Sequence, residues 1–231
     1  MGGVFFRRRR AAPVEILNDL SGDVVNLFRI VRHHPAALLT EQRLQIHARS
    51  ELRRLVALDP AALTDVQRAA RFLGILRMGY AGRPESRSFS GSPHSGRAQA
   101  RARLRAAIRA AHRRLERVAI EQLPFDQFIA RYDSDATLFY LDPPYWGSED
   151  DYGRGMFARA DFARLANQLG GIKGRFVLSL NDRPELRNIF GAFAIQDIAT
   201  TYMAAGHGTA ARELIVTDGR PIPQTGQIPL L

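Results

Sequence analysis

The chain has 231 residues, of which 45% are hydrophobic and 24% charged, and this composition suits a globular protein with a sizeable core. It contains no cysteine, which excludes disulfides and thiolate metal sites and favours the reducing cytoplasm. The formal net charge is +10 and Lys173 is the only lysine, so the arginine-rich chain should attract a polyanion such as nucleic acid. No apolar run is long enough to cross a membrane and no secretory signal follows Met1, so we expect no membrane partner.

The first half of the chain is predicted to be mostly helical. Apolar residues at helical spacing define the expected helices, while a composition of Gly, Ser, Pro and Arg marks a loop. In chain order, we expect a strand at 14–18, helices at 23–32, 41–58 and 62–77, a loop at 79–97 and a helix at 98–119. The last helix has an apolar seam, and its arginines lie largely on the other faces, at Arg101, Arg105, Arg109, Arg113 and Arg117.

The second half of the chain alternates predicted strands and helices. We expect strands at 137–141, 175–180, 192–202 and 212–217, helices at 160–169 and 184–190, and an irregular tail at 221–231. Strands that alternate with helices favour an open α/β sheet, on whose edge the helical block of the first half would be an insertion.

The motif Asp142-Pro143-Pro144-Tyr145 directly follows the apolar strand 137–141, and it suits chemistry on an amino group of a flat ring. Such an amine is a poor nucleophile until acceptors engage both of its hydrogens and localise the lone pair. The Asp142 carboxylate can accept one hydrogen and the Pro143 carbonyl the other, and two prolines fix the backbone before the substrate arrives. Tyr145 offers a face on which an extruded base can stack.

Other interpretations of this motif remain open. Turns favour Asp and Pro, so the tetrapeptide could be a turn after a buried strand. The exocyclic amine of cytosine poses the same electronic problem as that of adenine, so N4-cytosine is an alternative acceptor. The six histidines show no ligand spacing with a carboxylate cluster, and we expect no metal.

Several segments in order resemble the Dam-type adenine-specific DNA methyltransferases of bacteria and phages, and the resemblance covers nearly the whole chain. The segments are 14–19, 71–73, 82–89, 139–146, 151–153, 173–182 and 213–215. The resemblance implies an α/β fold with a Rossmann-like methyltransferase sheet and an inserted helical target-recognition block. It also implies a monomeric enzyme that transfers the methyl group of S-adenosylmethionine to N6 of adenine in double-stranded DNA.

The resemblance assigns roles to individual residues. Asp142, Pro143, Pro144 and Tyr145 match the catalytic motif, and Asp142 is also expected beside the cofactor. Asp19 matches the acidic residue that binds the ribose hydroxyls of the cofactor, although it could instead cap the next helix. Phe125 falls where the family packs a residue against the cofactor's adenine. The acidic residue often found before it is Pro124 here, and Phe125 could be a core residue.

The chain departs from the family pattern at its start. Gly2 and Gly3 look like the tail of the glycine loop that wraps the methionine end of the cofactor, and the family's first strand is missing. Either Met1 is an internal start or the chain is a truncated copy with impaired cofactor binding. The expected divisions are the start of the catalytic domain at 1–40, the target-recognition insertion at 41–118, the remaining catalytic domain at 119–220, and the tail at 221–231.

Candidate DNA contacts lie around the loop at 79–97. Arg77, Arg83, Arg87 and Ser88 match the family's target-reading segment, or else they are solvated loop residues. The predicted helix at 98–119 could follow a phosphate backbone, and 151–153 could be a lid over the base or a surface loop. The main alternative to an enzyme is a DNA-binding remnant that keeps the basic block but no longer holds the cofactor. Methylation of RNA or protein is disfavoured by the order of the motifs.

Overall fold

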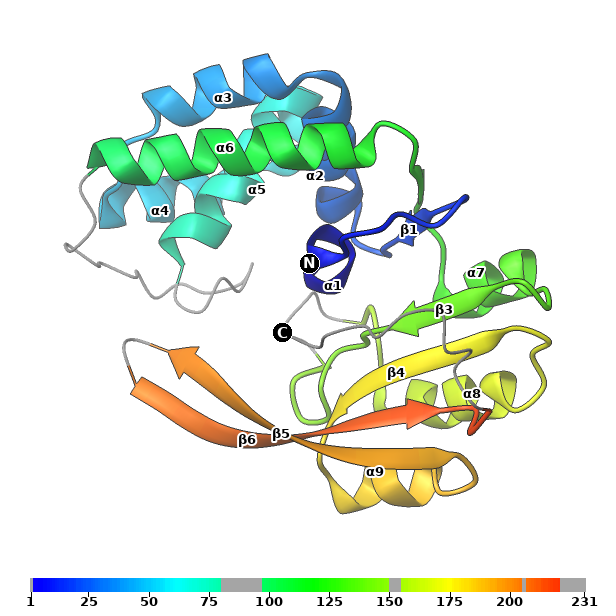
Figure 1. The fold of residues 1–231 in the computed structure, drawn as a ribbon. Coiled ribbons are helices and arrows are strands. Elements are labelled where there is room, and N and C mark those ends of the chain that lie inside the picture. Colours follow the sequence, from blue (N-terminus) through cyan, green and yellow to red (C-terminus); the bar gives the residue numbers. More distant parts are fainter. Residues whose placement is uncertain (1, 80–96, 150–154, 205–206, 221–231) are drawn as a thin grey trace. The chain divides into compact units, whose positions relative to one another are not determined.

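The computed structural model describes residues 2–79, 97–149, 155–204 and 207–220 (Figure 1). The chain divides into two compact units, and each is described by itself. One comprises Met1–Phe128 and Asp150–Met156, and the other comprises Ile129–Glu149 and Phe157–Leu231. In the described part of the chain, no helix combines the length and apolar character needed to cross a membrane.

The first unit is mainly a bundle of helices. Its elements are α1 (Gly3–Arg7), β1 (Ile16–Asn18), α2 (Gly22–His33), α3 (Pro35–Leu44), α4 (Arg49–Ala57), a 3₁₀ turn (Pro60–Ala62), α5 (Asp65–Met78), α6 (Arg97–Leu115) and β2 (Ala119–Glu121). The apolar seam predicted for α6 is buried at Ile108 and Leu115, which pack with Leu27 of α2, Leu38 of α3 and Phe72 of α5. Packing of these amphipathic faces, rather than local propensity, holds the bundle together.

The predicted helix at 41–58 is wrong in its middle, because α3 ends at Leu44 and α4 begins at Arg49. The side chain of Gln45, which directly follows α3, donates to the Ala70 carbonyl of α5 at 2.9 Å. Beyond the break, Leu52 of α4 packs against Ile75 of α5. The break is therefore set by contacts with α5, which no local pattern within 41–58 contains.

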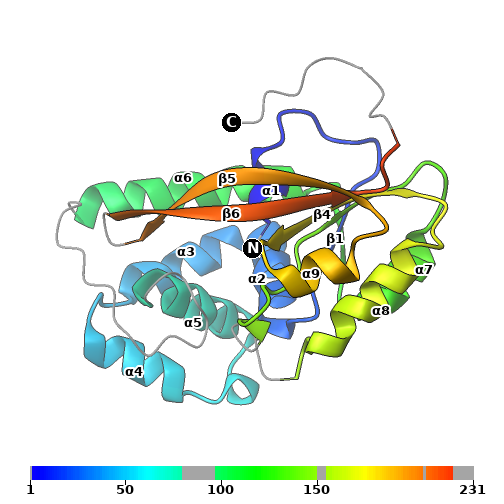
Figure 2. The same cartoon turned by 90° about the horizontal axis from the view of Figure 1, so that it is seen from below.

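The second unit contains a mixed sheet with two helices against it. Its strands are β3 (Leu138–Leu141), β4 (Arg175–Asn181), β5 (Ala194–Ala204) and β6 (His207–Thr217), and its helices are α8 (Arg159–Leu169) and α9 (Pro184–Ile189). The helix α7 (Phe125–Tyr132) spans the boundary between the units. The strand order is β3-β4-β6-β5, with β3 parallel to β4 and the other pairs antiparallel (Figure 1). Figure 2 shows β4, β5 and β6 of this sheet from below.

The two faces of this sheet differ in burial. On one face, Phe176, Leu178 and Leu214 are at most 2% exposed, and Phe162 of α8 and Leu186 of α9 are fully buried. On the other face, Leu138 and Tyr140 of β3 are 63% and 44% exposed. This period-two alternation fits a sheet with one covered face.

The strands form two separate ladders. β1 pairs in parallel with β2, and the four strands of the second unit form the other sheet. The fold is therefore mixed α/β with small sheets. Among the described residues, β1 and β3 each have a ladder partner on one side only.

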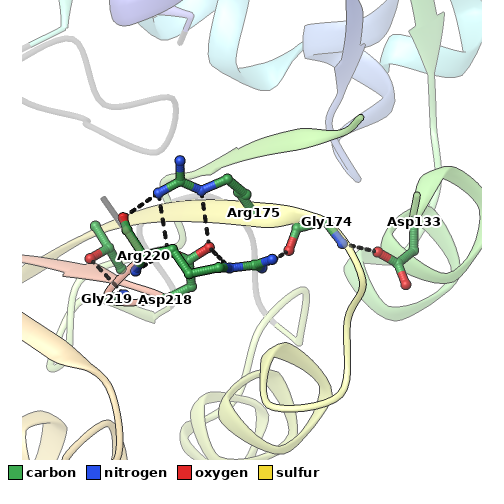
Figure 3. Close-up of polar contacts among 7 residues, drawn as sticks. Asp133, Gly174, Arg175, Asp218, Gly219 and Arg220 are labelled. Atoms are coloured by element: carbon green, nitrogen blue, oxygen red, sulfur yellow. Dashed lines mark hydrogen bonds and ion pairs between the residues drawn. The ribbon is translucent and has the colours of Figure 1, made fainter. Parts of the chain in front are cut away.

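A group of polar contacts fixes the amino end of β4 (Figure 3). Asp133 accepts the backbone N–H of Gly174 at 2.8 Å, and Arg220 donates to the Gly174 carbonyl at 2.6 Å. Asp218 forms ion pairs with Arg175 at 3.2 Å and with Arg220 at 2.8 Å. A Cβ at position 174 would lie 2.9 Å from the Thr137 carbonyl oxygen, which explains the glycine there. These contacts are structural, because they lie at the opposite end of β4 from Asn181.

An ion pair in the first unit joins the start of β1 to the end of α6. Arg114 donates to both carboxylate oxygens of Glu15, at 2.5 and 2.7 Å, and the Arg114 guanidinium lies 3.8 Å from the centre of the Phe5 ring. The hydrogen bond from Arg114 is the main cause that lowers the pKa of Glu15. The side chains of Glu15 and Arg114 are only 9% and 19% exposed, so this pair is better shielded than an ordinary surface pair.

Replacing Arg114 by alanine should lower the free energy of unfolding by about 2 kcal/mol at pH 7, because the shielded Glu15 carboxylate loses both hydrogen bonds from Arg114 and is left with the longer ion pair to Arg8, at 3.5 Å. The pKa of Glu15 is lower in the folded state, so this contribution is present above the unfolded pKa and is lost as pH falls through the folded pKa. Urea unfolding at pH 7 and at acid pH measures both effects. Arg113→Ala, at an exposed neighbour, is the control. Equal destabilisation by both substitutions would contradict the role of the pair.

Candidate active site

The motif at 142–145 lies on the turn that directly follows β3. Leu141 ends β3 and pairs with Leu178 of the parallel strand β4, so the motif begins at the carboxyl end of a parallel pair. The Asp142 side chain is exposed, and in the described part of the chain no hydrogen bond or ion pair engages its carboxylate. The carboxylate is therefore available to a ligand.

The surroundings of Asp142 change its acidity. Burial by neighbouring atoms raises the pKa of Asp142, and the negative charge of Glu213 on β6 raises it further. Burial also raises the pKa of Tyr140, with the charge of Asp142 as the next cause. A poorly solvated carboxylate makes a stronger hydrogen bond to an N–H donor than one in open water.

Side chains from β4 and β6 hold the end of the turn. Asn181, the last residue of β4, accepts the N–H of Trp146 at 2.9 Å and donates to the Trp146 carbonyl at 3.1 Å. The Tyr145 hydroxyl donates to Oε1 of Glu213 at 2.6 Å. Asn181 and Glu213 face each other in the register of β4 and β6, so one antiparallel pair fixes two consecutive residues of the turn.

The indole ring of Trp146 is packed as well as its backbone. Its centroid lies 5.3 Å from that of Phe162 on α8, and the Arg159 guanidinium lies 5.2 Å from the indole centroid. Arg159 also pairs with Glu149 at 3.3 Å. Gly147, at a φ of 87°, allows the tight reversal after Trp146. The turn is thus held by its backbone, its hydroxyl and its aromatic ring.

Asp19 lies directly after β1 and is partly exposed. Its Oδ1 accepts the backbone N–H of Ser21 at 2.8 Å, and no partner engages Oδ2 within the described ranges. The helix cap of α2 is Ser21, whose hydroxyl accepts the N–H of Val24, so Asp19 is not the cap. Burial raises the pKa of Asp19, and the hydrogen bond from Ser21 opposes that shift.

Phe125 begins α7, and the backbone of Leu123, two residues before it, is bound by the side chain of Asn18. Asn18, the last residue of β1, donates to the Leu123 carbonyl and accepts the Leu123 N–H, both at 2.9 Å. Phe125 is partly buried. Gly2 precedes α1 at a φ of 61°, where a Cβ would lie 3.0 Å from the Phe6 ring, while Gly3 has open space around its Cα. Gly2 therefore has a conformational reason to be glycine and Gly3 does not.

The predicted DNA contacts are only partly described. Arg77 is exposed and donates to Oε1 of Gln42 at 3.0 Å, and burial lowers its pKa, with the charge of Arg101 as the next cause. Arg83, Arg87 and Ser88 lie outside the described residues, as do the predicted lid at 151–153 and the tail at 221–231. No cluster of metal-ligating side chains occurs among the residues that the structure describes.

Sequence reasoning gave no role to Asn181, Glu213 or Asn18. All three lie in segments that carry the family resemblance, namely 14–19, 173–182 and 213–215. For the asparagines the available signal is position, because Asn18 ends β1 next to Asp19 and Asn181 ends β4 next to the motif strand. Glu213 lies inside β6 and has no such signal. Without the register of the strands, this position does not show whether an asparagine side chain binds the backbone of a neighbouring segment or only ends its strand.

The exposed Asp142, the two prolines and Tyr145 thus lie together on the turn at the end of β3. Residues 2–204 match the D12 class N6 adenine-specific DNA methyltransferase family, and the chain belongs to this family. The activity that this membership shows is S-adenosylmethionine-dependent methylation of adenine in DNA. No curated protein matches the sequence.

Proposed function

We propose that the turn after β3 receives an adenine base extruded from double-stranded DNA. The Asp142 carboxylate accepts one hydrogen of the N6 amine, the Pro143 carbonyl accepts the other, and Tyr145 stacks on the ring. The available carboxylate of Asp142, on a turn whose far end is held by β4 and β6, is the observation that carries this proposal. Pro144 keeps the backbone of the turn rigid.

In this arrangement the chain makes the amine nucleophilic and stabilises the charge that develops on it. Two acceptors localise the nitrogen lone pair, and the carboxylate stabilises the nitrogen as it becomes cationic. The pKa of Asp142 is raised by burial, which favours acceptance of a hydrogen from that nitrogen. S-adenosylmethionine, when bound, supplies the electrophilic methyl group.

For the cofactor, we propose that Asp19 binds the ribose hydroxyls and that Phe125 packs against the adenine, with Gly2, Gly3 and Asp142 also beside it. These residues fit the cofactor in one respect. The Oδ2 oxygen of Asp19 has no partner among the described residues and lies after the carboxyl end of β1, where it can accept hydrogen bonds from a diol. We further propose a Rossmann-like methyltransferase sheet. In support, each unit contains one parallel strand pair among its described residues, β1 with β2 and β3 with β4.

We propose that the helical block at 41–118 recognises the DNA target and that the enzyme acts as a monomer, with the catalytic domain at 1–40 and 119–220. The support is the density of exposed arginine on α6, with Arg77 at the end of α5. Arg83, Arg87 and Ser88 complete the proposed contacts to phosphates and base edges.

Transfer of tritiated methyl groups to duplex DNA, followed by digestion and separation of the nucleosides, tests the proposal. Label in N6-methyldeoxyadenosine is the expected result, and label in N4-methyldeoxycytidine would overturn the choice of acceptor. DNA binding that weakens with salt, together with no cofactor binding in calorimetry, would identify a DNA-binding remnant instead.

Asp19→Ala should weaken S-adenosylmethionine binding about 10- to 100-fold, because two hydrogen bonds from hydroxyls to a charged acceptor are lost. Isothermal titration calorimetry measures this directly. Asp65→Ala, in the first turn of α5, is the matched control and should bind the cofactor like the parent chain. An unchanged dissociation constant in Asp19→Ala would remove this residue from the cofactor site.

A further inference from the structure

We propose that Asn181 and Asn18 are positioning residues, each of which uses a side-chain amide to fix the backbone beside one part of the site. Asn181 positions the turn that holds the adenine, and Asn18 positions the segment that leads to Phe125. The inference rests on the proposed roles of Asp142 and Phe125, and it concerns residues that touch neither adenine nor cofactor.

The contact at Asn181 imitates a strand partner. Its amide engages both backbone groups of Trp146, at 2.9 and 3.1 Å, as a neighbouring strand would do. At the other end of the turn, Leu141 is joined to Leu178 by the ladder of β3 and β4. The residues between Leu141 and Trp146, two of them proline, are therefore tied to β4 at both ends.

A short, rigid segment tied at both ends cannot move its acceptors independently. The Pro143 carbonyl and the Asp142 carboxylate must meet two hydrogens of one amine at the same time, so a small displacement of either is costly. Glu213 adds a third tie through the Tyr145 hydroxyl at 2.6 Å. Placement of the two acceptors thus depends on Asn181 although its side chain does not form part of the acceptor pair.

The first unit contains a second contact of the same kind, between Asn18 and Leu123. Asn18 ends β1, β1 is parallel to β2, and Asn18 engages both backbone groups of Leu123, at 2.9 Å each. We call each of these asparagine contacts a clamp, Asn181 with Trp146 and Asn18 with Leu123. In both units the clamp joins the last residue of one strand to the segment that follows the parallel strand paired with it. The held residue lies close in sequence to a proposed binding residue: Trp146 directly follows Tyr145, and Leu123 lies two positions before Phe125.

Asparagine is required for this role because the clamp needs a donor and an acceptor on one short side chain. Aspartate has the same shape but lacks the donor, and its charge would face a backbone carbonyl. The substitution Asn→Asp therefore breaks one bond of each clamp with little change in volume. Asn26 offers a matched control, since it is 4% exposed and its amide donates to the Asp65 carbonyl at 2.9 Å.

The experiment compares Asn181→Asp, Asn18→Asp and Asn26→Asp in steady-state methyl transfer, with unfolding measured for each. Asn181→Asp should lower kcat about 10- to 100-fold with the KM for S-adenosylmethionine unchanged. Asn18→Asp should raise that KM about 10-fold with little change in kcat. Asn26→Asp should reduce stability and leave both constants unchanged. If all three variants change kcat and KM in proportion to their loss of stability, the clamps are merely structural and the proposal is overturned.

A second readout does not depend on activity. Trp146 is the only tryptophan of the chain, so its fluorescence reports on the Asn181 clamp directly. Asn181→Asp should increase quenching of Trp146 by acrylamide, while Asn18→Asp and Asn26→Asp should not. Calorimetry likewise tests the Asn18 clamp, with about 10-fold weaker binding of S-adenosylmethionine expected in Asn18→Asp only. Unchanged quenching or unchanged affinity would overturn the corresponding clamp.

Asp142→Asn, assayed in parallel, separates this inference from the proposed function. Full activity in Asp142→Asn would refute the proposed site itself. Loss of activity in Asp142→Asn together with parental constants in Asn181→Asp would refute the Asn181 clamp alone.

Discussion

Asp142→Asn is expected to lower the rate of methyl transfer about 100- to 1,000-fold while leaving DNA affinity unchanged. The amide keeps the size of the carboxylate and one acceptor oxygen, so the loss isolates the negative charge. Burial by neighbouring atoms raises the pKa of Asp142, and no partner among the described residues engages the carboxylate. Its interaction with a nitrogen that becomes cationic should therefore be strong.

Single-turnover methyl transfer and DNA binding at fixed salt measure the two parts of this prediction. Asp135→Asn, at an exposed position of the same unit, is the control and should behave like the parent chain. The parent rate should also fall on the acid side, since protonation of Asp142 removes the acceptor at a pH above the ordinary aspartate range. Asp142→Asn should lack this decline. Equal rates in parent and Asp142→Asn would rule out the assigned role.

Replacing Arg105, Arg109 and Arg113 together by glutamine is expected to weaken DNA binding about 100-fold at 0.1 M salt. These residues are four positions apart on α6, which places successive guanidinium groups about 6 Å apart along the helix axis. All three are exposed, and no carboxylate within the described ranges pairs with them. The opposite side of α6 is buried at Ile108 and Leu115, so the arginine side is free to face a phosphate backbone.

The salt dependence decides whether these arginines contact phosphates. Each phosphate contact contributes about 0.9 to the slope of log affinity against log salt, so the triple variant should lose roughly 3 from that slope. Fluorescence anisotropy with duplex DNA at several salt concentrations measures it. Glutamine is a good helix former, so α6 should persist.

A matched triple variant controls for net charge. Arg29, Arg43 and Arg53 are exposed on α2, α3 and α4, and their replacement by glutamine removes the same charge. This control should change the slope much less. If both triple variants reduce the slope equally, α6 contributes only to the overall positive field and makes no specific contact with phosphates.

Local patterns in the sequence determined several features because the interactions that create them join residues close together in the chain. The apolar run ahead of Asp142 predicted the strand β3, and the seam of α6 predicted the buried face at Ile108 and Leu115. The ordered motifs predicted the family, which the match over residues 2–204 confirms.

Only the tertiary structure decided how the turn after β3 is held. Asn181 reaches Trp146 across 35 positions and Tyr145 reaches Glu213 across 68, so the register of distant strands determines both contacts. The break between α3 and α4 has the same origin, because Gln45 finds its partner on α5. A helix or strand period reports which face of an element is apolar, but it carries no information about which distant backbone group a polar side chain will meet. The sequence by itself thus determined the family and the motif at 142–145, and the tertiary structure decided what holds that motif in place.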